Sequence, residues 1–228
     1  MNPRDYLKDI RQLFAAHGDP LTAEGQMAYM RHQFSFYGLK APVWTALFRE
    51  FVREHGYPAY GGDLEEVVRR AYEEEHRELH YVALQIIEKT QKNSGADLIQ
   101  LLEELILTHS WWDTVDWIAK LVGIHFQRFP DQIAPVTERW MASDSFWLQR
   151  VAIIYQLRYK DRTDTDRLFR YILQVARSRE FFLQKAAGWA LRQHAKTDPA
   201  LVAAFVSRET LPALTVREAR KQLVKEGY

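Results

Sequence analysis

Apolar residues recur every three or four positions along nearly the whole chain. Two of the clearest stripes are Tyr6, Ile10, Leu13 and Phe14, and later Leu98, Leu101, Leu102, Leu105 and Ile106. This spacing places the apolar side chains on one face of a helix. Gly, Pro and Asp interrupt the pattern about every 12 to 20 residues, which is typical of short helices joined by tight turns. No segment alternates as a strand does, so the sequence predicts an all-α fold.

The interruptions divide the chain into a series of expected helices. They cover residues 6–14, 27–34, 42–55, 63–75, 79–89, 98–106, 112–128, 131–142, 145–159, 164–178, 181–195, 199–208 and 215–225. Asp63 is expected to cap one of them, and Ser110 or Asp113 to cap the helix that begins near Trp112, because short polar side chains accept hydrogen bonds from first-turn amides.

An internal repeat groups these helices into pairs. The run Phe146–Ala152 returns 35 residues later as Phe181–Ala187, and Ala83 and Ala119 hold the same phase as Ala152 two and one repeats earlier. A period in the mid-thirties built from paired helices is typical of an α-solenoid. We therefore expect one domain over residues 1–228, made of about six HEAT-like helix pairs with a concave groove, in which residues 1–55 form an N-terminal helical cap.

The amino-acid composition limits the cellular compartment and the kinds of chemical site that we expect. The 228 residues are 47% hydrophobic and include no cysteine, which excludes disulfides and thiolate metal sites and suits a reducing cytoplasm. No signal peptide and no apolar run of about 18 residues is present, so we expect a cytoplasmic protein without a membrane span.

The small net charge of +1 conceals an uneven distribution. Residues 146–228 carry 16 Lys and Arg against 8 Asp and Glu, whereas residues 1–145 carry 15 against 22. Such asymmetry favours a polyanionic partner. Charge spread over solvated helix faces explains it equally well, because basic segments also occur in proteins that bind no nucleic acid.

The run Ser110–Asp116 contains the strongest candidates for chemistry. Trp112 and Asp116 are four residues apart and so share one face of a helix. Trp189 appears at a phase where the preceding repeat has Ile154. Core packing for the tryptophans and a dipole contact for the aspartate are the competing explanations.

Two cations share a repeat phase on successive helices. Arg150 lies two residues before Ala152, and Lys185 lies two residues before Ala187. We expect both to line the groove and contact phosphates, although isolated surface cations often have no specific task. Glu73, His76 and His80 fall on one helix face, but an acidic exposed helix is a poor metal site, and we expect neither a metal nor a cofactor.

Together these motifs resemble the AlkD-like DNA alkylation repair glycosylases. The similarity lies in the run 110–116, in Trp147–Arg150, in Phe181–Arg192, and in Met27–Phe34 followed by Gly38-Leu39-Lys40, and it spans nearly the whole chain. The resemblance implies a catalytic set of Asp116, Trp112 and Trp189. It also implies DNA contacts from Arg150, Tyr29, Lys185 and Arg192.

The resemblance further implies an activity. The chain would be a monomeric, monofunctional glycosylase that hydrolyses the N-glycosidic bond of cationic N3- and N7-alkylated purines in double-stranded DNA. A lyase step would need an amine nucleophile, and no lysine is marked for that role. The alternative is a non-catalytic α-solenoid adaptor that binds protein or undamaged DNA.

Overall fold

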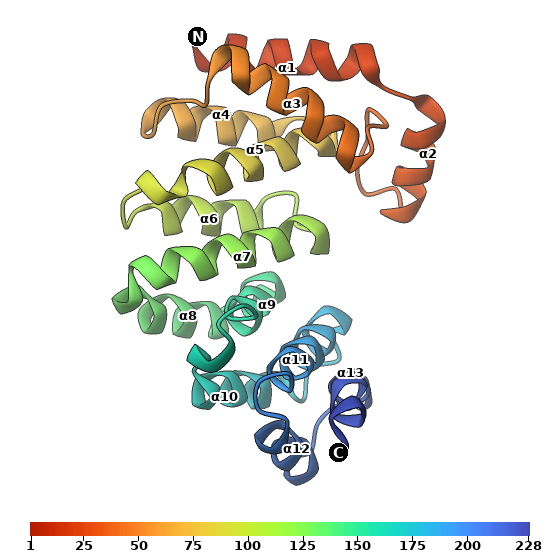
Figure 1. The fold of residues 1–228 in the computed structure, drawn as a ribbon, viewed down its shortest axis with the longest axis vertical. Coiled ribbons are helices and arrows are strands. Elements are labelled where there is room, and N and C mark those ends of the chain that lie inside the picture. The colour runs from red at the N-terminus through yellow and green to blue at the C-terminus, as the bar shows by residue number, and fades with distance from the viewer. The chain divides into compact units, whose positions relative to one another are not determined.

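The computed structural model describes all residues from Met1 to Tyr228, and its regular secondary structure is helical apart from one isolated bridge between Ser35 and His76. The all-α repeat fold expected from the sequence is confirmed (Figure 1). The helices are α1 (Pro3–His17), α2 (Pro20–Tyr29), α3 (Ala41–His55), α4 (Gly62–Glu73), α5 (Arg77–Thr90), α6 (Leu98–Leu107), α7 (Trp112–Arg128), α8 (Ile133–Met141), α9 (Phe146–Ile154), α10 (Thr165–Val175), α11 (Phe181–His194), α12 (Pro199–Arg208) and α13 (Ala213–Leu223). None of these helices is long and apolar enough to cross a membrane.

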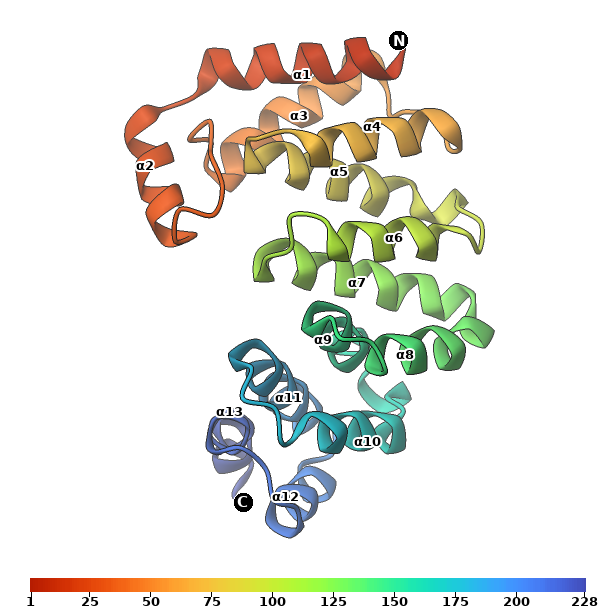
Figure 2. The same ribbon diagram turned by 180° about the vertical axis from the view of Figure 1, so that it is seen from behind.

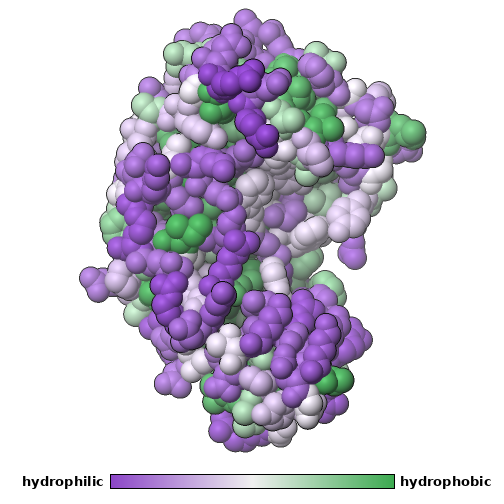
Figure 3. All heavy atoms as spheres, in the orientation of Figure 1, coloured by the Kyte–Doolittle hydropathy of each residue, from purple (hydrophilic) through white to green (hydrophobic).

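The chain forms two compact units, Met1–Leu101 and Leu102–Tyr228, whose boundary lies within α6. Each unit has its own apolar core. That residues 1–228 form one domain, with residues 1–55 as an N-terminal cap, stays a prediction. Hydrophilic residues cover most of the face drawn in Figure 3, with hydrophobic ones in small separate patches.

In the first unit, a buried carboxylate fixes the segment that joins α2 to α3. Glu78, near the start of α5, is fully buried and accepts hydrogen bonds from the backbone amides of Tyr37, Gly38 and Leu39 at 3.0–3.1 Å. Backbone amides that lack a helical partner need such an acceptor when they are buried. Helix α5 therefore holds this connection in place.

Helix α2 begins and ends earlier than expected, so the predicted helix over 27–34 is wrong. Asp19 accepts from the Thr22 amide and Pro20 occupies the first turn, which together start the helix. Arg31 and His32 then adopt positive φ angles that no α-helix allows. The apolar pattern did not reveal α2 because Ala23 is its one buried residue.

The second unit consists of successive helix pairs, and both ribbon views show α10 beside α11 (Figures 1 and 2). The repeat alanine is buried in every second helix: Ala119 on α7, Ala152 on α9 and Ala187 on α11 are 1–2% exposed. Small side chains at these positions let neighbouring helices approach closely, as the repeat predicted. Gly123 extends this contact, because an added Cβ would lie 2.3 Å from the Tyr155 carbonyl oxygen.

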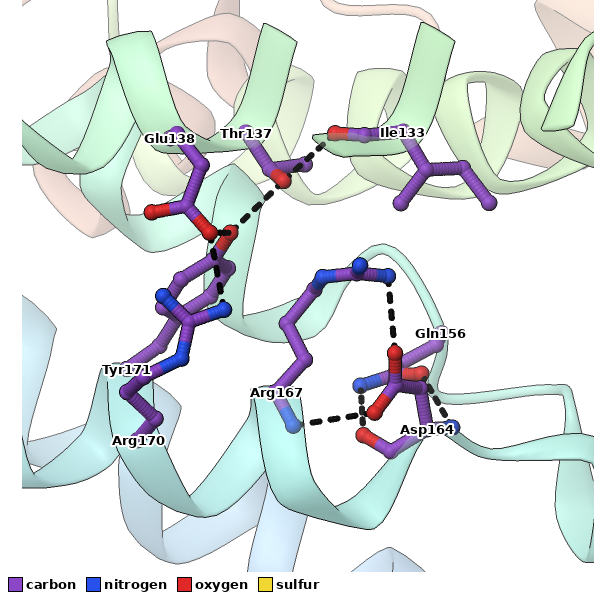
Figure 4. A network of polar contacts seen from close by, with 8 residues as sticks. All are labelled: Ile133, Thr137, Glu138, Gln156, Asp164, Arg167, Arg170 and Tyr171. Carbon is purple, nitrogen blue, oxygen red and sulfur yellow. Dashed lines mark hydrogen bonds and ion pairs between the residues drawn. The ribbon is translucent and has the colours of Figure 1, made fainter. Parts of the chain in front are cut away.

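Polar contacts join the helices on the other side of these pairs. Tyr171 of α10 is fully buried, and its hydroxyl contacts Thr137 at 2.7 Å and donates to Glu138 at 3.0 Å, both on α8 (Figure 4). Arg170 adds an ion pair to Glu138 at 2.7 Å. Thus hydrogen bonds and an ion pair between side chains join α8 to α10.

Some expected helix ends differ from the observed ones. Helix α9 ends at Ile154 and not near residue 159, because the Gln156 side chain binds both the amide and the carbonyl of Asp164 at 3.0–3.1 Å and closes a loop (Figure 4). Gly61 is the N-cap residue of α4, so the expected cap by Asp63 is wrong.

Candidate functional site

The site begins at the amino end of α7, where two tryptophans lie in sequence. Trp111 occupies the N-cap position in an extended conformation, and Trp112 is the first helical residue. The expected cap by Ser110 or Asp113 is therefore wrong. Ser110 instead donates its hydroxyl proton to the Ile106 carbonyl at 2.6 Å.

Asp116 lies in the second turn of α7 and forms a two-point ion pair with Arg150 of α9. The Arg150 Nε donates to Oδ1 at 2.7 Å, and its Nη2 donates to Oδ2 at 2.9 Å. The Asp116 side chain is 20% exposed and that of Arg150 is 6% exposed. Paired N–H groups on a carboxylate fix its orientation as well as its charge, so this acid is held in one orientation while its side chain stays partly exposed.

Arg150 also reaches a third helix. Its Nη1 donates to the Phe182 carbonyl at 2.6 Å, in the first turn of α11. Three guanidinium nitrogens are thus placed on protein acceptors, and the group is largely buried. The phosphate contact expected for Arg150 stays a prediction. The observed contacts give it a defined task, which is to hold Asp116.

Opposing effects act on the charge of Asp116. Burial raises the pKa of Asp116 above its usual range, and the negative charge of Asp113 raises it further, while the contact with Arg150 lowers it. The net result is a raised pKa. The carboxylate is therefore stabilised in its charged form chiefly by one cation, helped by its place near the amino end of α7.

The two expected tryptophans lie on different helices of this unit. Trp112 is one helical turn before Asp116 on α7, and Trp189 lies in the second half of α11. Both are partly exposed, so their rings are neither fully packed in the core nor free of neighbours. Helical spacing places Trp112 on the same face of α7 as Asp116. Part of each tryptophan side chain therefore reaches the protein surface.

Aromatic rings gather beside the ion pair, at the amino ends of α7, α9 and α11. Trp111 contacts Trp147 and Phe182 edge-on, with ring centroids 6.2 and 5.4 Å apart. Phe146 stacks on Phe182 at 6.3 Å, and Phe181 is 54% exposed. Of these rings, that of Phe182 faces the Arg150 guanidinium, with its centroid 5.9 Å from Cζ. The guanidinium is largely buried, and low exposure to water strengthens its attraction for Asp116.

Lys185 and Arg192, both expected to bind DNA, lie on α11 and contact the same acid. Each forms a 2.8 Å ion pair with Glu218 of α13. They lie four residues before and three residues after Trp189 and so share its helix face. Tyr29, the last residue of α2, is 72% exposed and belongs to the first unit.

Three contributors to the site were not found from the sequence. The Phe182 carbonyl is a backbone group, which no residue pattern can indicate. Glu218 looks like any charged residue of an amphipathic helix, although it is only 2% exposed. Trp111 had a signal in the tandem tryptophans at the start of a helix, but helical spacing favoured its neighbour Trp112, which shares a face with Asp116.

Comparisons with known proteins agree on one family. A family model described as "DNA alkylation repair enzyme" matches residues 10–223. A solved structure described as a predicted DNA alkylation repair enzyme from Enterococcus faecalis is 31% identical, with a TM-score of 0.85 over 91% of this chain and 97% of that one. A search of the curated proteins gives no match.

Proposed function

The chain belongs to the DNA alkylation repair enzyme family, and on this premise we propose that it is a monofunctional DNA glycosylase for cationic alkylated purines. It would hydrolyse the N-glycosidic bond of N3- and N7-alkylated purines in double-stranded DNA, acting as a monomer. The observation that carries this proposal is the carboxylate of Asp116, held at two points by Arg150 and partly open to solvent.

The reaction explains why a fixed carboxylate would be useful. Alkylation at N3 or N7 places a positive charge on the purine and makes the base a good leaving group. When the glycosidic bond breaks, that charge moves to the sugar, which becomes oxocarbenium-like. A preorganised negative charge beside the sugar stabilises this transition state, and such electrostatic terms are often the largest in catalysis. Asp116 would also orient the water that adds to the sugar.

The tryptophans would supply selectivity for charge. An indole face attracts a cation by about 0.5–2 kcal/mol, depending on how far both are desolvated. Trp112 and Trp189, both partly exposed, would thus favour a positively charged nucleotide over a neutral one. Flat rings at an open surface would also tolerate larger alkyl groups than a closed pocket does.

Arg150 would act through Asp116. The guanidinium sets the direction of both carboxylate oxygens and opposes the effect of burial on the pKa of Asp116. It is therefore a positioning residue in this proposal, and a phosphate contact would use the N–H groups that the protein leaves unoccupied. Since no lysine is proposed as a nucleophile, the products would be the free base and an intact abasic strand.

Release of free base from a duplex that contains N7-methylguanine tests the activity. We expect the Asp116→Asn variant to release base about a hundredfold more slowly or worse, the scale of losing one preorganised electrostatic contact. Asp113→Asn is the matched control, because it removes the same charge from the same helix and leaves the two hydrogen bonds between Asp116 and Arg150 in place. It should retain most of the wild-type rate.

The same assay distinguishes the proposed glycosylase from the alternative, a non-catalytic adaptor that binds DNA. If wild type and Asp116→Asn both bind the duplex and neither releases base, the protein is a DNA-binding adaptor and the proposed chemistry is wrong. If Asp116→Asn and Asp113→Asn lose activity to the same extent, the negative charge of the region matters and the position of Asp116 does not.

A further inference from the structure

Helix α13 contributes a buried acid to the surface of α11. Glu218 is 2% exposed and lies where the two helices cross. The crossing is close because Gly188 is on the opposing face: a Cβ added there would lie 2.5 Å from the Glu218 Cβ and 2.9 Å from the Thr215 carbonyl oxygen. Thr215 reinforces the crossing, since its hydroxyl donates to the Gln184 carbonyl at 3.0 Å.

Three cations surround this single carboxylate. Lys185 and Lys221 each donate to its Oε1 at 2.8 Å, and Arg192 donates to its Oε2 at 2.8 Å. Two come from α11 and one from α13. We call Glu218, Lys185, Arg192 and Lys221 the Glu218 cluster.

The Glu218 cluster has more positive charge than a structural ion pair needs. One cation balances one buried carboxylate, so two positive charges remain in excess. The acid is hidden, while the side chains of Lys185, Arg192 and Lys221 are 37%, 32% and 52% exposed. The three cations therefore form a positive surface patch, and the acid that partly neutralises them is buried beneath it.

The cations also keep unused donors. An ammonium has three N–H groups and a guanidinium has five, and each of these side chains gives one to Glu218. Several donors thus remain for an external anion with multiple acceptor oxygens. A phosphate group meets that description, because its oxygens accept from Lys and Arg together.

We propose that the Glu218 cluster is a binding site for a backbone phosphate of DNA, in which Glu218 positions the cations and Lys221 is an additional DNA contact. The inference rests on the proposed function only in taking DNA as the partner. Lys185 and Arg192 flank Trp189 on one face of α11, so the bound phosphate would belong to the nucleotides next to the one that Trp189 contacts.

Glu218 gives the site its affinity by organising it in advance. Long cationic side chains lose rotamer freedom when they bind a ligand, and this loss weakens binding. In this structure the three side chains already converge on one acid. The acid thus reduces the entropic cost of binding although its own charge repels phosphate.

Salt dependence of DNA binding tests the site directly. The probe is a fluorescein-labelled, undamaged duplex, whose dissociation constant is measured by anisotropy over a series of NaCl concentrations. Lys221→Ala should weaken binding several-fold and reduce the slope of log K against log salt concentration by about one, the signature of a lost phosphate contact. Arg220→Ala removes an equal charge from the neighbouring, exposed position of α13 and should leave the slope nearly unchanged.

Glu218→Gln tests the positioning role. Removing a negative charge should strengthen DNA binding if only net charge matters, whereas loss of an organising acid should weaken it. We expect weaker binding. Tighter binding by Glu218→Gln, or equal slopes for Lys221→Ala and Arg220→Ala, would overturn the proposal. Should Glu218→Gln fail to fold, the comparison of Lys221→Ala with Arg220→Ala decides alone. Lys221→Ala should still fold, because Lys185 and Arg192 remain paired with Glu218.

These measurements are independent of base release. A protein that releases no base can still show the expected slopes, in which case the site stands and the glycosylase proposal fails. If the protein releases base but Lys221→Ala leaves the salt slope of DNA binding unchanged, the phosphate site is wrong and the proposed function stands.

Discussion

Arg150 stabilises the charged form of Asp116. Burial and Asp113 both raise the pKa of this carboxyl, and Arg150 is the group that opposes them. A buried acid without its cation tends to take up a proton. The activity proposed for Asp116 therefore depends on a residue that does not meet the reacting atoms.

The pH profile of base release should reveal this dependence. The proposed catalysis needs ionised Asp116, so the rate should fall on the acid side as pH drops through its pKa. Arg150→Gln should raise that pKa further and move the acid limb to higher pH. A rate profile measured with N7-methylguanine duplex compares the two proteins. A uniform loss at all pH values, with the limb unmoved, would show that Arg150 acts in some other way.

Binding measurements separate this task from the phosphate contact expected at the same residue. Arg150→Ala should weaken binding to undamaged duplex and flatten its salt dependence by about one phosphate contact. The measured quantity is again the slope of log K against log salt concentration. An unchanged slope would remove Arg150 from the DNA surface and leave it solely as the partner of Asp116.

At the scale of elements, the close crossing of α11 and α13 depends on Gly188. Gly188→Ala would force its Cβ against Glu218 and the Thr215 backbone, because neither helix backbone can move away cheaply. We expect the free energy of unfolding to fall by about 1–3 kcal/mol, the usual cost of overpacking. Denaturant unfolding measures this value. Gly25→Ala is the control, since its added Cβ meets nothing within 4 Å in the exposed part of α2, and it should be neutral or slightly stabilising.

Elements whose apolar stripe meets a core were predictable from the sequence. The expected ranges for α7 and α12 agree with the structure at both ends; Asp198 caps α12, whereas the N-cap residue of α7, Trp111, provides no side-chain cap, so the bounds of α7 follow from periodicity alone. Helix α2, where few residues are buried, and the end of α9, where the Gln156 side chain closes a loop, were predicted wrongly. Boundaries set by long-range side-chain contacts leave no local pattern.

The candidate site was predictable only as a set of residues. The motifs pointed to Asp116 and Arg150 separately, with Arg150 expected to face phosphate. Their two-point contact joins residues 34 positions apart, and it depends on the stacking of α7 against α9. Glu218 stayed hidden for the same reason, because its burial is decided by the packing of α13 on Gly188.

At the scale of the whole molecule, Glu218 should influence stability in acid. Burial alone would raise its pKa, but Lys185 and Lys221 outweigh burial and lower the pKa from 4.5 to about 2. A lowered pKa stabilises the folded protein above pH 4.5, and this contribution disappears as pH falls towards 2. The shift corresponds to at most about 3 kcal/mol.

Unfolding at several pH values checks this contribution. Glu218→Gln should be less stable than wild type at pH 7, and the difference should shrink steadily between pH 4.5 and pH 2. A constant difference over that range would mean that the carboxyl group stabilises by shape and not by charge. Asp116 works in the opposite direction, because its raised pKa makes ionisation unfavourable to folding as pH rises.

Arg150 of α9 joins three alternate helices, because it contacts Asp116 on α7 and the Phe182 carbonyl on α11. The orientation of the Asp116 carboxylate thus depends on how these three helices are placed relative to one another. A distant substitution that slides one repeat by a fraction of an ångström would misdirect the charge while every reacting group stayed in place. Damage of that kind would look like a catalytic defect in an otherwise sound protein, and its origin would be mechanical.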